Sequence, residues 1–298
     1  MKLDRLRRSV LASIAALIAL LVGALAAPRT AQAANLGCSI ASVSGINLNY
    51  SPATATPLTA SGTVTITCNK NGNNTDIRYL ELGANAGLNA SGTQNRAVNG
   101  TSLLSYSLRR DAALTAAWAD TSGNRLTASV NANTTTTLTL NWWLVAAAGQ
   151  LVSAGTHVDT VTLSLYQDNK PNPALTDPTP QTATLSIALT VTSQCGLSST
   201  PGPVAFQYTS FQTTAATAVS SFAVTCTLGA PYTVSLDATS GTMLGLSYQL
   251  ALSPTGPRTG TGLAQAMSVT GTIPAGQSGT CAAASCTATQ VRTLTISY

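Results

Sequence analysis

Charged side chains are scarce in this chain. Asp, Glu, Lys and Arg make up 8% of its 298 residues, and there is one histidine, His157. Acid–base catalysis needs titratable groups close together, and a nucleic-acid surface needs clustered Lys and Arg to neutralise phosphates. After residue 33 the sequence has no such basic cluster, so we expect no nucleic-acid partner. This composition favours a rigid extracellular structural protein over an enzyme.

The first 33 residues have the pattern of a secretory signal peptide. Basic residues come first, the apolar run Val10–Ala27 follows, and Ala31–Ala33 forms a small-x-small cleavage site. An uncleaved membrane anchor is the alternative, because the apolar run is long. Residues 1–33 hold five basic side chains and one acidic side chain, which is +4 of the chain's +5 net charge. The basic pI is therefore a property of the signal and not of the exported protein.

Long helical periodicities are missing from the remaining 265 residues, which is 298 minus 33. Short alternating segments separated by Gly, Asn and Pro recur instead, and this pattern is typical of all-β sandwiches. The clearest segment is Thr182–Thr192, TATLSIALTVT. Its alternation predicts a half-buried strand with four apolar side chains on one face: Leu185, Ile187, Leu189 and Val191.

All six cysteines lie in the exported part of the chain, where an even number predicts disulfides. Cys38 and Cys68 are 30 residues apart, and Cys195 and Cys226 are 31 apart. These matched spacings favour the pairs Cys38–Cys68 and Cys195–Cys226, with Cys281 and Cys286 closing a small loop. A metal site at Cys281 and Cys286 is the alternative, but no further Cys or His lies nearby to complete four ligands.

The two halves of the exported chain contain the same motifs in the same order. The matched pairs are Val64–Cys68 with Phe222–Cys226, Leu104–Leu108 with Leu246–Leu250, Ala147–Gln150 with Pro274–Gln277, and Asp159–Tyr166 with Gln290–Tyr298. This alignment equates Tyr298 with Tyr166. The strand predicted at Thr182–Thr192 then follows the first copy only.

These motifs resemble the spore coat protein U domain, the subunit of archaic chaperone–usher pili. In the first copy the resemblance rests on Tyr106–Asp111, Trp118–Asp120, Ala148–Gln150, Ala154–Val161 and Tyr166. The family usually has Tyr at the position of His157 and Gly at that of Ala119, and the second copy lacks the Trp-Gly-Asp element. A chain with two such domains is similar to the tip adhesin of these pili.

The resemblance implies two immunoglobulin-like β-sandwich domains, the second lacking its final strand. We expect residues 34–192 to be an outer adhesive domain closed by its own strand, 182–192. Residues 193–298 are then a pilin domain completed by a donor strand. Cleavage after Ala33 would leave four residues before Cys38, too few for a donor strand, which places the chain at the fibre tip.

The partners that the family implies are a periplasmic pilus chaperone, an outer-membrane usher and an adjacent pilin subunit. The chain would pass through the periplasm to the cell surface, attach to an abiotic or host surface and support biofilm formation. We expect no cofactor. A secreted coat protein that builds an extracellular matrix is the alternative function. An enzyme is a third hypothesis, based on His157 and Asp159, which alternation places on one strand face.

Adhesive contacts are expected from aromatic side chains and apolar loops. Alternation puts Trp142 in the core and Trp143 on the opposite face, so Trp143 is the contact candidate, although a covering loop is equally compatible. Trp118 lies in the family motif and is expected to pack in the core. The apolar, charge-poor loops expected at the distal end of the outer domain are Gly83–Gly92, Ala112–Asn124 and Val145–Ala154.

Overall fold

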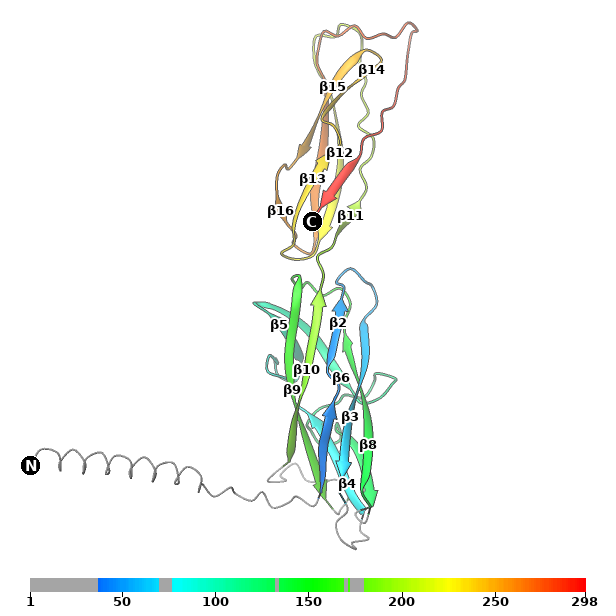
Figure 1. Ribbon diagram of the computed structural model, residues 1–298. Helices are drawn as coiled ribbons and strands as arrows, with labels where there is room; N and C mark the ends of the chain where they lie inside the picture. Colours follow the sequence, from blue (N-terminus) through cyan, green and yellow to red (C-terminus); the bar gives the residue numbers. More distant parts are fainter. Residues whose placement is uncertain (1–36, 70–76, 132–133, 169–170, 172–179) are drawn as a thin grey trace, which may run out of the picture.

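The computed structural model describes residues 37–69, 77–131, 134–168, 171 and 180–298 (Figure 1). The proposed signal peptide lies outside these residues. Within the described part all regular structure is β-strand, as the alternating segments predict. In the same part, no helix is long and apolar enough to cross a membrane.

Ten strands form what we call the first unit, residues 38–191. They are β1 (Cys38–Val43), β2 (Ile46–Tyr50), β3 (Leu58–Cys68), β4 (Ile77–Ala84), β5 (Asn95–Asn99), β6 (Ser102–Arg109), β7 (Leu126–Asn131), β8 (Thr136–Ala146), β9 (Gly155–Asp168) and β10 (Gln181–Val191).

Eight further strands form the second unit, residues 195–298. They are β11 (Cys195–Ser199), β12 (Ala216–Cys226), β13 (Pro231–Leu236), β14 (Ser240–Met243), β15 (Leu246–Ser253), β16 (Arg258–Thr259), β17 (Ala264–Ile273) and β18 (Leu294–Ser297). The two units lie end to end, and the chain passes between them once, directly after β10 (Figure 1).

The two units repeat one strand order. The first unit contains the order β1-β3-β8-β6-β5, and the second contains β11-β12-β17-β15-β14. Strand β4 pairs with β7 and β9, and in the same way β13 pairs with β16 and β18. In the first unit β9 also pairs with β5 and β10, and β10 pairs with β2. In the second unit the two sheets stay separate: within residues 195–298 no pairing corresponds to the one between β5 and β9, and no strand takes the place of β10.

Side-chain hydrogen bonds repeat with the strands. The Tyr50 hydroxyl donates to the Ala147 carbonyl at 2.7 Å and accepts from the Gln150 amide at 3.0 Å. Tyr208 makes the same two bonds, to the Pro274 carbonyl at 3.1 Å and from the Gln277 amide at 2.9 Å. Residues 204–208, which are in no strand, are therefore the second unit's counterpart of β2.

The structural alignment of β9 with the end of the second unit differs by one residue from the alignment of their sequences. Tyr106 donates to Asp159 at 2.7 Å, and its counterpart Tyr248 donates to Gln290 at 2.5 Å. Asp159 therefore corresponds to Gln290, and Tyr298 falls one residue beyond the counterpart of Tyr166. The sequence comparison had equated the two tyrosines, and this was wrong because both motifs end in Tyr but differ in length by one residue.

Strand β10 closes the first unit. It lies antiparallel to β9 over its whole length and parallel to β2, with Leu189 opposite both His157 and Leu48. Its inward side chains are at most 2% exposed: Leu185, Ile187, Leu189 and Val191. Each buried aliphatic side chain of this kind stabilises a fold by roughly 2 kcal/mol. The apolar residues of the alternating sequence therefore face the core, and the residues between them face outward.

The second unit has a small core. Seven buried residues of the fully described range 195–298 form it: Phe222, Val224, Cys226, Tyr232, Val234, Met267 and Val269. Around them Leu250, Leu252, Leu294 and Ile296 are only partly buried. The first unit's equivalents of Leu294 and Ile296 are Leu163 and Leu165, which are fully buried.

Three disulfides join Cys38 to Cys68, Cys195 to Cys226, and Cys281 to Cys286. The first two link the opening strand of each unit to the next long strand, at the same register position. The third closes a loop just before the segment that leads to β18. Cys281 and Cys286 are thus bonded to each other and hold no metal as thiolates.

The two adjacent tryptophans lie on opposite faces of β8. Trp142 is fully buried and packs against Trp118, with ring centroids 5.7 Å apart. Trp143 is half-buried on the outer face, opposite Ser61 of β3 and Arg109 of β6. The alternation of the sequence therefore correctly predicted that Trp142 lies in the core and Trp143 on the opposite face.

This difference sets an expectation for stability. Trp142→Ala should lower the free energy of unfolding of the first unit by about 3–5 kcal/mol, as large core truncations do. Trp143→Ala should cost about 1 kcal/mol, the usual effect of a less buried substitution. Denaturant titration of both variants measures the two losses, and equal losses would contradict the assignment of Trp143 to the outer face.

Candidate functional site

The outer edge of β18 is unpaired. Among the strands that the structure describes, it pairs with β13 alone, with Val234 opposite Ile296 and Leu236 opposite Leu294. Its equivalent in the first unit, β9, is covered on the other side by β10. Main-chain N–H and C=O groups along a free edge can hydrogen-bond to an added strand. We call the edge of β18, together with residues 204–208, the open edge.

Residues 204–208 form the second side of the open edge. Val204, Phe206 and Tyr208 are partly buried and alternate with exposed residues, as the side chains of β2 do. Phe206 packs near Tyr248 with ring centroids 6.4 Å apart, and its ring lies beside Gly271. This extended segment makes no strand pairing in the fully described second unit. Its equivalent, β2, pairs with β10 alone among the described strands, and the second unit has no counterpart of β10 to pair with residues 204–208.

The missing pairing also shortens β18. Strand β9 spans 14 residues, whereas β18 spans four. By the alignment of Asp159 with Gln290, residues 286–293 correspond to the first half of β9, yet they are in no strand. Gln290 is exposed, while Asp159 is buried. In the first unit the corresponding half of β9 is paired with β10.

Arg292 is the charged group at the open edge. It takes the place of Val161, which lies opposite Leu185 in the first unit. Its guanidinium donates to the Ser240 carbonyl at 2.9 Å and to the Tyr248 hydroxyl, and it lies 5.6 Å from the Tyr248 ring centroid. The open edge is thus apolar at Leu294 and Ile296 and cationic at Arg292.

His157 and Asp159 make no hydrogen bond to each other. His157 is 0% exposed, and its ring nitrogens lie 3.3 Å from the Gly155 carbonyl and 3.0 Å from the Ser102 hydroxyl. Asp159 accepts from the Tyr106 hydroxyl at 2.7 Å and from the Leu88 amide at 3.0 Å. Both side chains are occupied in fixing loops and strands to one another, which is a structural role.

Asp120 of the family motif lies in a charged cluster with Arg125 and Glu81. Arg125 is 1% exposed and bonds to Glu81 at 2.9 Å and to Asp120 at 3.1 Å. Its guanidinium also lies 3.6 Å from the ring centroid of Tyr166, whose hydroxyl donates to Asp120 at 3.1 Å. Removing one partner of such a group leaves an uncompensated buried charge, which is strongly destabilising. This cluster holds the 110–125 loop onto β4 and β9.

The loops expected at the distal end lie elsewhere. Residues 149–152 line a cleft against the second unit. The expectation for Val145–Ala154 was wrong, because β8 runs toward the junction and the loop after it lies there. Gly83–Gly92 and Ala112–Asn124 lie along the flank, where Leu88 bonds to Thr160 and Trp118 to Leu82. The end opposite the junction carries the ends of β3, β7 and β9.

Residues 204–208 were missed in the sequence, although their alternation, VAFQY, parallels INLNY of β2. The shared tyrosine was a usable signal. The self-complementing strand and Trp143 were identified in the sequence, and their roles in assembly and adhesion stay predictions.

The model of the Spore Coat Protein U domain matches residues 24–164 and 181–255. The chain belongs to this family. The family match ends before the Cys281–Cys286 loop, so that loop lies outside the matched part of the Spore Coat Protein U domain. No curated protein matches the chain.

Two solved structures illustrate what this Spore Coat Protein U chain is similar to. One is the pre-assembly complex of the chaperone CsuC with the tip adhesion subunit CsuE, from archaic Csu pili of Acinetobacter baumannii. It has 13% identity and a TM-score of 0.42, and the match covers 88% of this chain and 100% of that chain. The other is the CupB6 tip adhesin of Pseudomonas aeruginosa, with 11% identity, a TM-score of 0.41, and coverage of 80% and 89%.

The buried histidine predicts a pH dependence for the first unit. Burial lowers the pKa of His157, and the hydrogen bond to the Gly155 carbonyl opposes this only in part. The unfolded chain therefore takes up a proton below about pH 6.5 while the folded state stays neutral, so stability falls as the pH drops through that value.

The test compares the wild-type chain with His157→Asn by denaturant titration at pH 7 and pH 5. The wild type should lose more stability than the variant over this interval. Equal losses would show that the charge state of His157 does not affect folding.

Proposed function

We propose that this protein is the tip adhesin of a chaperone–usher pilus. In this proposal residues 34–192 form the adhesive domain and residues 193–298 form the pilin domain. The observation that carries the proposal is the difference between two otherwise matched units. Strand β10 fills the first unit, and the corresponding place in the second unit is an open edge.

The open edge favours strand addition over binding of a small molecule. An added strand would lie antiparallel to β18 and parallel to residues 204–208, as β10 does with β9 and β2. Main-chain hydrogen bonds give such a complex affinity, and alternate side chains give it specificity. The partly buried Leu294 and Ile296 offer the apolar surface that those alternate side chains would cover.

The partners follow from this mode of binding. An unpaired apolar edge promotes aggregation unless another chain covers it. A periplasmic chaperone would cover it first, an outer-membrane usher would receive the complex, and the adjacent pilin would supply the permanent strand. The family membership supports this assignment, and the chain would act at the cell surface in attachment and biofilm formation.

A donor strand fused to the chain tests the proposal. A copy of Gln181–Val191 is appended after Tyr298 through a flexible linker. The fusion should raise the stability of the second unit by several kcal/mol, because it buries four aliphatic side chains at roughly 2 kcal/mol each. It should also protect the amides of β18 from hydrogen exchange and prevent incorporation into pili.

The matched control carries aspartate at the two appended positions copied from Ile187 and Leu189. This fusion should leave the second unit unchanged. If the apolar fusion also gives no protection at β18, the edge does not accept a strand and the proposal is wrong.

Trp143 is the proposed adhesive contact of the first unit. Its aromatic ring is half-buried on an outer sheet face that carries no covering strand in the described part of the chain. Trp143→Ala should reduce the number of cells attached to a surface under flow while pilus number stays constant. Attachment equal to wild type would remove Trp143 as a contact.

A further inference from the structure

The end of the second unit farthest from the first unit presents an exposed aromatic side chain. Phe211 is 70% exposed and has a φ of +59°, a conformation that costs energy for a side chain of this size. Its amide donates to the Gln277 carbonyl at 2.8 Å, which ties its loop to the segment leading to the Cys281–Cys286 disulfide. We call residues 208–212 and 277–286 together the terminal face.

The equivalent residues of the first unit contact the second unit. Tyr50 corresponds to Tyr208, so Ala53 corresponds to Phe211. Ala53 lines a cleft of about 450 Å³ between the units, together with residues 149–152 of the first unit and 194–198 and 225–228 of the second. The terminal face of the second unit therefore corresponds to the surface of the first unit that contacts the second unit.

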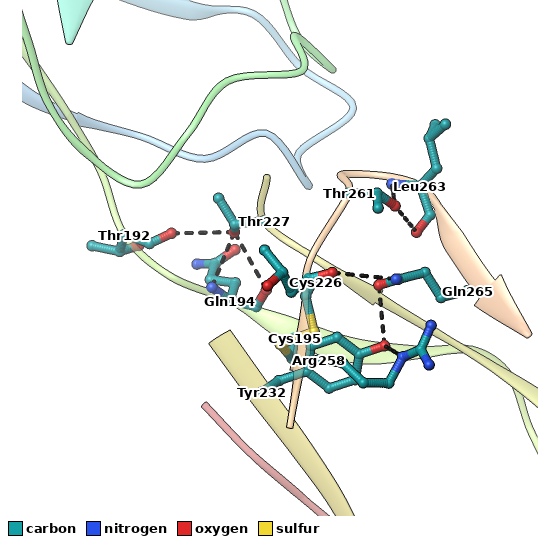
Figure 2. Close-up of a disulfide and its surroundings, with 11 residues drawn as sticks. Thr192, Gln194, Cys195, Cys226, Thr227, Tyr232, Arg258, Thr261, Leu263 and Gln265 are labelled. Carbon is teal, nitrogen blue, oxygen red and sulfur yellow. Dashed lines mark hydrogen bonds between the residues drawn. A yellow bond between two sulfur atoms is a disulfide. The ribbon is translucent and has the colours of Figure 1, made fainter. Parts of the chain in front are cut away.

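Hydrogen bonds hold the intrachain junction. The Ser51 hydroxyl donates to the Gln194 side chain at 3.1 Å, and Ser153 pairs with Leu228 across the units. Figure 2 shows the Thr227 hydroxyl beside Thr192 and Gln194, with the Cys195–Cys226 disulfide below and to the right. The base of the second unit is thus fixed to the end of β10.

Strand β10 has two roles in this junction. It completes the first unit, and it leads to Cys195 within four residues of Val191. The second unit is therefore attached directly to the end of β10, the strand that completes the first unit. A pilin subunit that supplied its strand to the open edge would reach the terminal face in the same way.

We propose that the terminal face is the docking surface for the base of the next pilin subunit, with Phe211 packed beside the first disulfide of that subunit. This inference rests on the proposed function. The partner is a pilin whose donor strand of alternating apolar residues precedes its first cysteine by a few residues.

The differences between the two units fit this role. The units of this chain are joined covalently, so their junction needs little contact area. A junction between separate chains lacks that link and has to gain affinity from contacts, for which buried aromatic side chains are effective. The terminal face has Phe211 where the first unit has Ala53. Gln290 also follows Gln277 by 13 positions, whereas Asp159 follows Gln150 by nine, and the disulfide braces the extra length.

Site-specific photocrosslinking of the full chain in its producing cells tests the proposal. Benzoylphenylalanine replaces Phe211, Val291 or Val219 in three separate variants. Val291 is 84% exposed beside the open edge, and Val219 is 60% exposed on β12. Assembled pili are sheared off, irradiated and mapped by mass spectrometry.

The probe at Phe211 should crosslink to a pilin within a few residues of its first disulfide, and the probe at Val291 should crosslink to the donor strand of the same pilin. The probe at Val219 should give no pilin adduct. Crosslinking from Val291 without any from Phe211 would overturn the docking surface and keep the proposed function. Absence of pilin adducts from both positions would contradict the proposed function itself.

The variant Phe211→Ala gives a second measurement. It should increase the loss of this chain from pili under shear about tenfold, the size expected when an aromatic anchor is removed from an interface. Val219→Ala is the matched control and should behave as wild type. Equal retention of both variants would show that Phe211 contributes nothing to the junction.

Discussion

The structure depends on the main-chain hydrogen bonding of one strand, β10, which has partners on both of its edges. It pairs with β9 and β2, and its inward side chains fill the core between the two sheets of the first unit. Apart from β2 and β10, each strand of the first unit has a counterpart strand in the second unit, and the second unit has a smaller core. The same backbone order therefore gives a closed fold in one case and an open edge in the other.

The sequence was sufficient for the fold class, the repeat and the strand that completes the first unit. These features rest on side-chain alternation and on cysteine spacing, which a strand pattern expresses directly. Leu185 and Ile187 could be assigned to the core because a strand has a period of two. Trp142 and Trp143 were separated by the same rule.

Other features depend on where strands run in space. Val145–Ala154 was placed at the wrong end because the direction of β8 relative to the junction is not encoded in the local pattern. Tyr298 was aligned one residue away from its structural position, because both motifs end in tyrosine. The hydrogen bond from Tyr248 to Gln290, which matches the bond from Tyr106 to Asp159, gives the correct alignment. The position of Phe211 became meaningful only when the equivalent Ala53 was found at the contact between the units.

The direction of β10 also decides how the molecule carries load. The strand runs along the long direction of the first unit and continues directly into the second unit (Figure 1). A pull on the second unit would therefore draw β10 lengthwise past β9 and β2. Its eleven residue pairs with β9 and five with β2 would resist together instead of opening one after another. Shear of this kind distributes tension over the whole strand, so the full length of the β10 pairing would bear the load.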